Sequence, residues 1–557
     1  MSRYERITGG RALVPVEEAR LSFMSRIGRT LGLTRRRPVR LLAVPRDPVA
    51  GDKQAGAAML EGWFAHGGQR RALAEIDPAD ASLPAEMWER LQSFAWLRDL
   101  AAAATHERGR AVAEPLTRAW LERVPEKPEG PLWRADLWGR RLLFWPAYAP
   151  YLLAARDPDY RKRMLLLLKR GARHIERSGD KLPAGLPRLA AWAGAVAASL
   201  LVQGAQDRIA KAEAGLARAV RGGLSDDGGL ISRAPAEQLE LVELLGLLRA
   251  AYATTTRGMP EWLEDAQQGA LAALLCVRAA DGALSSWQGG NPGDRARLHA
   301  ALESTLVTEP PAAQARGWGY QRVHAKEAVL ILDAAPPPPA KAHPGACAST
   351  LAFEFCDGPL RLIVNCGGAG EQSSRLPAEL SRLLRSTAAH SALTLGDCNS
   401  TSILADGGMG RGVAEVDMER GTRDGLLMVE ASHDGYVRRF GLVHQRRLLL
   451  TPDGKALDGI DVLMPKGKTG KQPVPFSLRF HLAPGVEVTR TADGRGALLR
   501  ARGHKPWQFK CRGGLLEVED SIWIDGMAQP RPTLQLAVAG ESPSDGMTIS
   551  WELKRAG

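Results

Sequence analysis

The spacing of apolar residues changes once along this chain, at a proline run that spans residues 336–339. Before the run, apolar residues recur every three or four positions, as at 59–64 and 186–202, which is typical of amphipathic and buried helices. After it, short runs alternate apolar and polar residues and are separated by Gly and Asp-Gly turns, which favours β-strands. The pattern therefore predicts a helical domain followed by a β domain.

The predicted fold class is α+β with several domains: an N-terminal (α/α) toroid of paired helices, then a C-terminal antiparallel β-sandwich. We place a basic lead at residues 1–50, the helical domain at 51–335, a proline-rich linker at 336–344 and the sandwich at 345–557. Within the sandwich, residues 437–442 are among the expected strands.

The net charge of the chain is positive, and this limits the kinds of partner that the protein is expected to bind. The chain has 557 residues, 45% of them hydrophobic, and a formal net charge of +12. Such an excess suits an acidic partner (a nucleic acid, an anionic membrane surface or an anionic polysaccharide), although it also serves solubility. No nucleic-acid-binding motif accompanies the charge, so a specific nucleic acid is not expected.

Residues 21–40 alternate apolar side chains with arginines. This basic amphipathic stretch is either a peripheral contact with an anionic membrane or a solvated helix packed on the first domain. The N-terminal residues lack the apolar core of a secretory signal, so we expect a cytoplasmic protein. The six cysteines form no Cys-x-x-Cys pair, which favours reduced, buried thiols over a zinc ribbon.

Four polar stretches are the candidates for chemistry. They span residues 227–238, 343–367, 385–395 and 433–447, and the third reads Arg-Ser-Thr-Ala-Ala-His-Ser-Ala-Leu-Thr-Leu. In this order, after a helical domain, they resemble the heparinase II/III family of polysaccharide lyases. The resemblance covers nearly the whole chain and is strongest in the third stretch.

The resemblance implies an (α/α) toroid, an antiparallel sandwich and a cleft between them that performs β-elimination on uronic-acid sugars. It makes an acidic polysaccharide or oligosaccharide the expected partner, and a cell-envelope or periplasmic location the alternative to the cytoplasm. Such a reaction needs a base for the C5 proton, an acid for the leaving oxygen and a group that neutralises the uronate carboxylate.

The chain departs from the family at the catalytic positions. The tyrosine expected two residues after a proline is Glu237, following Pro235. The Asn-His pair expected near residues 182–187 is absent from that stretch, and the catalytic histidine aligns with Gly345.

The family's zinc site departs as well. Its His, Asp and His ligands align with Cys347, Asn365 and His390. An asparagine is a poor zinc ligand, so we expect no cofactor, with zinc at this degenerate site as the alternative.

The remaining candidates each have two interpretations. Tyr436 is an acid or base facing the cleft, or an aromatic beside a turn; Arg233 is a clamp for a uronate carboxylate, or part of a local salt bridge. Glu237 is a base, or a first-turn residue favoured by the helix dipole. His390 is a brace of the cleft and residual ligand, or a buried histidine at the sheet rim.

Four further residues are candidates for binding the sugar, and these are His433, His444, Arg447 and Trp287. The histidines are either directed at the substrate or at solvent, and Trp287 either stacks on a sugar ring or packs in the core. Two functions remain open at this point. One is a lyase that cleaves or binds uronate polysaccharide by β-elimination, and the other is a binding or scaffold protein that keeps the fold without the catalytic set.

Overall fold

The computed structural model divides the chain into two units, Met1–Arg40 and Leu41–Gly557, and the second contains all the elements below. The described residues are 39–80, 82–305, 317–339, 342–370, 372, 375–468, 470 and 472–556. The membrane contact predicted for residues 21–40 lies outside them, apart from residues 39 and 40.

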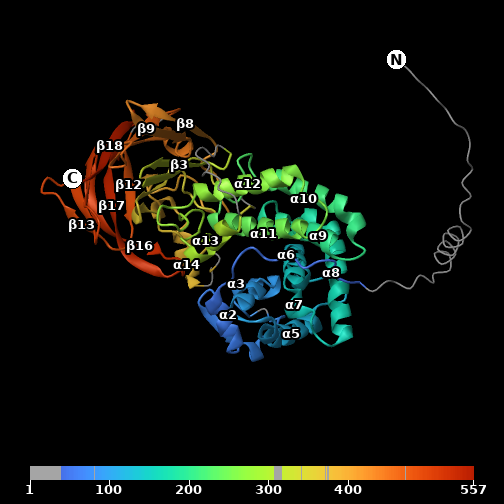
Figure 1. Ribbon diagram of the computed structural model, residues 1–557. Coiled ribbons are helices and arrows are strands. Elements are labelled where there is room, and N and C mark those ends of the chain that lie inside the picture. Colours follow the sequence, from blue (N-terminus) through green and yellow to red (C-terminus); the bar gives the residue numbers. More distant parts are fainter. Residues whose placement is uncertain are drawn as a thin grey trace, which may run out of the picture. The chain divides into compact units, whose positions relative to one another are not determined.

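The first half of the second unit is built from helices with one small β-hairpin (Figure 1). The helices are α2 Lys53–Leu60, α3 Ala85–Ser93, α4 Trp96–Ala103, α5 His106–Arg123, α6 Ala135–Ala147, α7 Ala149–Leu152, α8 Pro158–Ser178, α9 Leu186–Leu201, α10 Ile209–Gly223, α11 Pro235–Ala253, α12 Glu261–Cys276 and α13 Arg295–Ser304. The hairpin pairs β1 Trp63–His66 with β2 Gln69–Ala72. In the described residues, no helix is long and apolar enough to span a membrane.

Helix α9 is buried nearly all round, which explains its run of small residues. A Cβ on Gly139 of α6 would lie 2.1 Å from the Ala190 carbonyl oxygen, and one on Gly194 would lie 2.1 Å from that of Gly139. Glycine at both positions therefore allows the backbones of α6 and α9 to cross in close contact.

Indole rings fill the core beside this crossing. Trp120, Trp138 and Trp145 contact one another edge to face, with ring centroids 5.6–6.0 Å apart. The fully buried Arg141 places its guanidinium over Trp120 and Trp138 and donates to the main-chain oxygens of Gln92 and Leu132. These contacts hold a buried cation that forms no ion pair with a carboxylate among the described residues.

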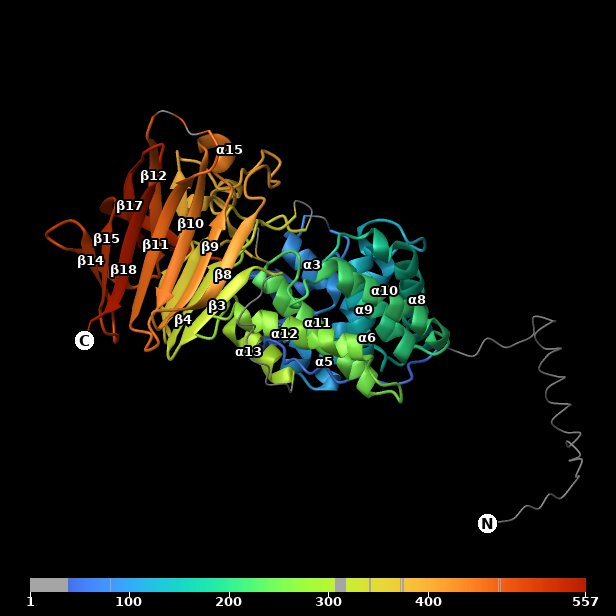
Figure 2. The same cartoon turned by 90° about the horizontal axis from the view of Figure 1, so that it is seen from above.

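The second half is a sandwich of two antiparallel sheets (Figure 2). One sheet has the order β13-β14-β15-β18-β11-β10-β9-β8, and the other has the order β16-β17-β12-β6-β5-β4-β3, with β7 paired to β12. The strands are β3 Tyr320–Ala325, β4 Ala328–Asp333, β5 Phe353–Asp357, β6 Leu360–Val364, β7 Leu393–Leu395, β8 Val416–Arg423, β9 Leu426–His433, β10 Leu442–Leu450, β11 Ala456–Pro465, β12 Val474–Leu482, β13 Val486–Arg490, β14 Gly496–Ala501, β15 Trp507–Arg512, β16 Leu515–Ile524, β17 Pro530–Ser542 and β18 Met547–Arg555. Two short helices, α14 Ala378–Leu383 and α15 Val437–Phe440, lie in its loops.

The two sheets bury one continuous apolar core between them. Strand β11 alternates buried and half-buried positions along its length, as expected for a strand with one face on the core. The predicted class, a helical domain followed by an antiparallel sandwich, is thus confirmed.

The domain boundary differs from the sequence prediction. Strands β3 and β4 precede the proline run, yet β4 pairs with β5 in register, from Ala328 with Asp357 to Leu332 with Phe353. The sandwich therefore begins before Tyr320, and the predicted linker 336–344 is a connection inside it. The β4 sequence is apolar from Ala328 to Leu332 and buried on both faces, so its periodicity did not distinguish it from a helix.

A second expected element was also wrong. Residues 437–442 were predicted as a strand, but Val437–Phe440 form the short helix α15, which ends at Gly441 with φ 73°. The arginines at its C-terminus lie where a helix favours positive charge, and glycine allows the left-handed end.

Candidate functional site

Arg233 connects the helical region to the sandwich through hydrogen bonds and an ion pair. It lies in the loop before α11 with φ 57°, and its side chain is only 6% exposed. Its guanidinium donates to the carbonyl oxygens of Trp318 (2.8 Å) and Pro336 (2.9 Å) and to Asp333 Oδ1 (2.5 Å), and it stacks over Tyr320. With its donors engaged this way, Arg233 has a structural partner where the sequence allowed a substrate carboxylate.

The same network continues from Asp333 into the predicted metal position. Ser349 Oγ donates to Asp333 Oδ2 at 2.7 Å, Gln288 Nε2 donates to Ser349 Oγ at 3.1 Å, and the Cys347 amide donates to Gln288 Oε1 at 2.9 Å. The Cys347 thiol is buried, and burial raises its pKa to about 12. The thiol donates to the Gly345 carbonyl oxygen at 3.3 Å, so its sulfur already has a partner within the protein.

The other two predicted ligands also form hydrogen bonds within the protein. Asn365 donates to Glu354 Oε1 at 3.2 Å and accepts from the Ser391 amide at 3.0 Å, while His390 Nδ1 lies 2.7 Å from the Ser386 carbonyl oxygen. Burial lowers the pKa of His390. No group of three or more His, Cys, Asp or Glu residues in the described ranges is arranged to hold a metal ion. The donor set does not fit the zinc ion that the family resemblance implies.

Glu237 and His343 form a pair at the junction of the two regions. Glu237 lies in the first turn of α11, and its Oε1 is 3.0 Å from His343 Nδ1. On the other side of the ring, His343 Nε2 is 2.9 Å from the Gln288 carbonyl oxygen. Both ring nitrogens thus lie within hydrogen-bonding distance of an oxygen, which fixes the orientation of the ring. The side chains are 27% and 15% exposed, so solvent reaches this pair.

The structure places Tyr436 inside the sandwich. It is 1% exposed, and its hydroxyl donates to the Leu393 carbonyl oxygen at 2.7 Å. Burial raises the pKa of the phenol well above its usual value. The ring lies 5.3 Å from that of His433, which is itself buried and accepts from the Gly435 amide.

His444 and Arg447 lie on β10 beside these residues. His444 Nε2 is 2.7 Å from Asp461 Oδ1, which also accepts from the fully buried Arg446 at 2.8 Å. Burial opposes ionisation of Asp461, but Arg446 and His444 hold its pKa at about 2. Arg447, in contrast, is partly exposed and pairs with Glu430 on the neighbouring strand.

Trp287 is a core residue in this structure. It has no exposed surface, its indole nitrogen donates to Ser285 Oγ at 2.8 Å, and its ring packs on Tyr320. Of all the sequence candidates, the structure brings Arg233, Glu237, Trp287 and Cys347 to the junction between helices and sandwich. It places His433, Tyr436 and His444 between the two sheets.

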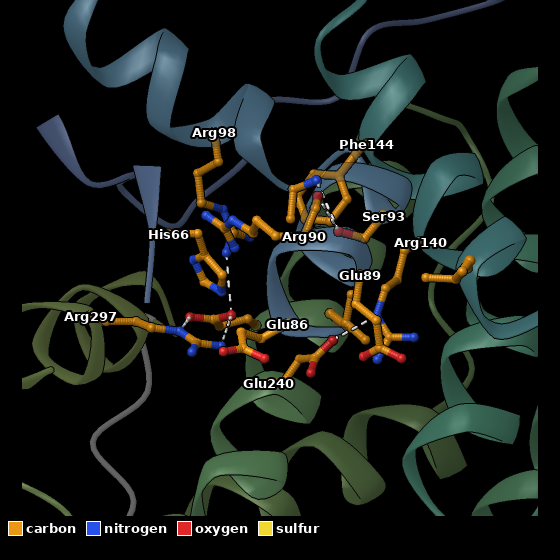
Figure 3. A pocket seen from close by; sticks show the side chains of 14 residues that line it. His66, Glu86, Glu89, Arg90, Ser93, Arg98, Arg140, Phe144, Glu240 and Arg297 are labelled. Atoms are coloured by element: carbon orange, nitrogen blue, oxygen red, sulfur yellow. Dashed lines mark hydrogen bonds and ion pairs between the residues drawn. The ribbon is translucent and has the colours of Figure 1, made fainter. Parts of the chain in front are cut away.

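A separate cavity of about 170 Å³ lies among the helices (Figure 3). Its lining includes four arginines and four glutamates, contributed mainly by α3, α6 and α11 with Arg98 from α4 and Arg297 from α13. His66 of β1 also faces it; burial, then Arg90 and Arg297, lower the pKa of this histidine to about 3, so it is neutral at physiological pH.

Every arginine of this cavity is paired with a carboxylate. The ion pairs are Arg90 with Asp99 (2.5 Å), Arg98 with Asp47 (2.9 Å) and Glu243 (3.3 Å), Arg140 with Glu240 (2.7 Å) and Asp136 (3.5 Å), and Arg297 with Glu243 (2.9 Å). Figure 3 shows Arg140 and Glu240 joined across the cavity wall. The lining carries as many acidic as basic groups, so its positive charge is already neutralised.

Sequence reasoning missed His343 as a site residue and missed this ion-paired cavity. His343 had a visible signal, because it stands two residues before the glycine that aligns with the family's catalytic histidine. The cavity had none, because its arginines come from segments up to 207 positions apart, from Arg90 to Arg297, that only the fold brings together.

Comparison with known proteins agrees with the class that these elements define, a helical region joined to a two-sheet sandwich as in polysaccharide lyases. The profile described as "Heparinase II/III-like, C-terminal" matches residues 307–552, which include β3 and β4. FtsZ-localized protein C of Caulobacter vibrioides is 30% identical over 551 residues, covering 93% of this chain and 91% of that protein. The chain therefore belongs to the heparinase II/III-like family.

Solved structures share the fold at low sequence identity. A crystal structure of heparinase III is 12% identical, with a TM-score of 0.68 over 97% of this chain and 90% of that one. The heparan sulfate lyase HepC from Pedobacter heparinus is 14% identical, with a TM-score of 0.57 over 90% and 83%.

Proposed function

We propose that this protein is a catalytically degenerate member of its family that acts as a scaffold at sites of FtsZ assembly and does not cleave polysaccharide. One observation carries the proposal: the residues at the family's reactive positions are engaged in contacts within the protein. Arg233 is buried against Asp333. The Cys347 thiol donates to the Gly345 carbonyl oxygen and Asn365 Oδ1 accepts from the Ser391 amide, hydrogen bonds that a metal would have to break.

The chemistry of β-elimination supports this proposal. The reaction needs an uncommitted cation at the uronate carboxylate, because charge builds there as the C5 proton leaves. In the helical cavity each arginine already has a carboxylate partner, so a uronate would have to displace an existing ion pair. Tyr436, the candidate acid or base, is buried, and its hydroxyl donates a hydrogen bond to the Leu393 carbonyl oxygen.

The FtsZ association in this proposal is inferred from the 30% identical relative described above. FtsZ-localized protein C aligns with this chain over nearly the full length of both. A shared position in the cell is a property that a fold can keep after its chemistry is lost, because localisation depends on surfaces and not on a reactive set.

Two experiments test the two halves of the proposal. Incubation with a panel of uronate glycans, followed by ultraviolet absorbance of the unsaturated product, should give no signal above a heat-denatured control. A fluorescent fusion should coincide with FtsZ in dividing cells, and the purified protein should sediment with FtsZ polymers. A glycan-dependent absorbance would refute the loss of catalysis, and a diffuse fusion that stays in the supernatant would refute the FtsZ association. The fusion also tests the predicted cytoplasmic location.

A second candidate function is a uronate lyase with a replaced base, favoured by the exposure of Glu237 and His343. In it, the Glu237 carboxylate takes the C5 proton in place of the family's tyrosine, and His343 holds that carboxylate in position. The C4–O bond breaks as the C4–C5 double bond forms, and the leaving oxygen takes a proton back from the Glu237 carboxyl group. This candidate requires turnover that Glu237→Gln abolishes while glycan binding remains. Absence of turnover by the unmodified protein on every glycan excludes it.

A further inference from the structure

A second cavity, of about 290 Å³, lies between the end of α12 and the β3–β4 hairpin, and we call it the α12–β3 pocket. Figure 2 shows α12 beside these strands. Its lining includes Arg278, just after α12, together with Arg322, His324 and Lys326 from β3 and its turn. The pocket is separate from the junction residues and from the ion-paired cavity described above.

Charge distinguishes this pocket from the cavity among the helices. Arg278, Arg322 and Lys326 line it with a single acidic side chain, Glu327. Within the described part of the chain, none of these three cations forms an ion pair with a carboxylate. The positive charge of the α12–β3 pocket is therefore not neutralised, whereas that of the helical cavity is.

The protein itself holds Arg322 in place. Its guanidinium Nη1 donates to the carbonyl oxygens of Cys276 (3.3 Å) and Arg278 at the end of α12. Carbonyl oxygens orient a guanidinium without cancelling its charge. Burial, and to a smaller extent the nearby Arg278, lowers the pKa of Arg322.

The walls of the pocket favour a peptide over a sugar. Between the cations lie the aliphatic side chains of Leu275, Val329 and Pro359, and no Phe, Tyr or Trp lines the pocket on which a sugar ring would stack. In addition, β3 is the last strand of its sheet, so one edge of it lacks a strand partner among the described strands. An extended peptide can pair with such an edge through its main chain and place alternate side chains in adjoining pockets.

We propose that the α12–β3 pocket binds an extended acidic segment of a partner protein. Carboxylates of the segment pair with Arg278, Arg322 and Lys326, an aliphatic side chain contacts Leu275 and Val329, and the segment's main chain follows β3. This inference does not depend on the proposed FtsZ association, because it concerns the chemistry of the ligand and not its name.

The test uses the full-length protein and a fluorescein-labelled peptide, Glu-Glu-Leu-Glu-Glu-Leu-Glu, with the glutamine version Gln-Gln-Leu-Gln-Gln-Leu-Gln as the uncharged probe. Fluorescence anisotropy should show binding of the acidic peptide that weakens with salt, and at least about tenfold weaker binding of the glutamine peptide. The double variant Arg278→Gln, Lys326→Gln should lose about tenfold in affinity as well.

The matched control removes two charges elsewhere. Arg490→Gln with Lys510→Gln changes exposed residues of β13 and β15, on the other sheet, and should alter the affinity less than about twofold. Thermal unfolding checks that each variant is folded. If the Arg278 variant is unstable, Lys326→Gln alone, in the exposed two-residue turn, should weaken binding about threefold.

Three results would overturn the proposal. One is no binding of the acidic peptide, and another is an equal loss in the pocket variant and in the control, which would indicate only long-range attraction. The third is binding of a heparin oligosaccharide that the pocket variant abolishes while the peptide stays unbound, which would make the pocket a sugar site.

Discussion

The Arg233 guanidinium and the Asp333 carboxylate, separated by 100 positions in the sequence, meet at 2.5 Å in the buried junction between the helices and the sandwich. Trp318 and Pro336 supply further acceptors to the same arginine. The pair therefore helps to hold the helical region and the sandwich of the second unit together. Removing it should lower the free energy of unfolding.

We expect Arg233→Met to lower the free energy of unfolding by about 3 kcal/mol or more, because it leaves Asp333 buried without its cation. Urea unfolding followed by circular dichroism measures the change. Arg218→Met is the control: its partner Asp180 is half exposed, so the loss should stay below about 1 kcal/mol. Equal losses in both variants would contradict a structural role for the Arg233 pair.

Tyr436→Phe should destabilise the protein by about 1 kcal/mol, because the buried Leu393 carbonyl loses its donor. Tyr436→Ala should cost about 3 kcal/mol or more, since it also leaves a cavity between the sheets. Neither change should alter glycan or peptide binding measured by anisotropy. A loss of binding in a folded Tyr436→Phe variant would instead place the hydroxyl in a ligand site.

Glycine at the crossing of α6 and α9 is required by the close backbones, so Gly194→Ala should lower the unfolding free energy by about 2 kcal/mol or more, as overpacking does. Gly222→Ala in α10 is the matched control. A Cβ there meets nothing within 4 Å, and alanine should stabilise the helix by about 0.5–1 kcal/mol. Thermal and urea unfolding of the two variants should therefore change in opposite directions.

His481 should make the protein less stable in acid. Burial lowers the pKa of this histidine from 6.5 to about 3, so between these values the unfolded chain binds a proton that the folded chain does not. The unfolding free energy should accordingly fall by about 1.4 kcal/mol per pH unit as the pH drops through that window, and be unaffected by this group above it.

The variant His481→Gln, compared with the unmodified protein, isolates the contribution of this histidine. The variant should make the dependence of unfolding free energy on pH shallower by one proton below pH 6.5. A slope that is the same in the variant and in the unmodified protein would show that His481 is not the group responsible. His66 and His390 also have lowered pKa values, so part of the slope should remain in the His481 variant.

Removal of metal should have no effect on stability. Because Cys347 Sγ, Asn365 Oδ1 and His390 Nδ1 each have a hydrogen-bond partner within the protein, a chelator should leave the melting temperature unchanged, and added zinc should not raise it. Thermal unfolding with and without zinc measures this, together with metal analysis of the purified protein. A zinc-dependent rise that Cys347→Ser removes would contradict it.

The sequence was sufficient for the order of the two structural classes, because periods of 3.6 and 2 persist over long stretches of it. It failed where periodicity carries no information. Strand β4 is apolar at five consecutive positions, Ala328–Leu332, as a buried helical segment also is, and the edge strand β8 loses its alternation at 421–423, where consecutive residues are exposed.

The candidate site was harder to predict than the fold, because the sequence does not show burial. Arg233 and Trp287 have residue types that bind uronates, yet both are enclosed by residues distant in the chain. The unneutralised cations of the α12–β3 pocket were present in the sequence, but nothing there distinguished them from arginines that the fold pairs with carboxylates.

The early start of the sandwich has a consequence for anyone who dissects this protein. A fragment cut at the proline run would leave β3 and β4 on the helical piece and strip β5 of its neighbour, opening a buried hydrogen-bonding edge to other molecules. The aggregation of such a fragment would come from the unpaired edge of β5. A cut placed upstream of Trp318 keeps the whole sheet on one polypeptide.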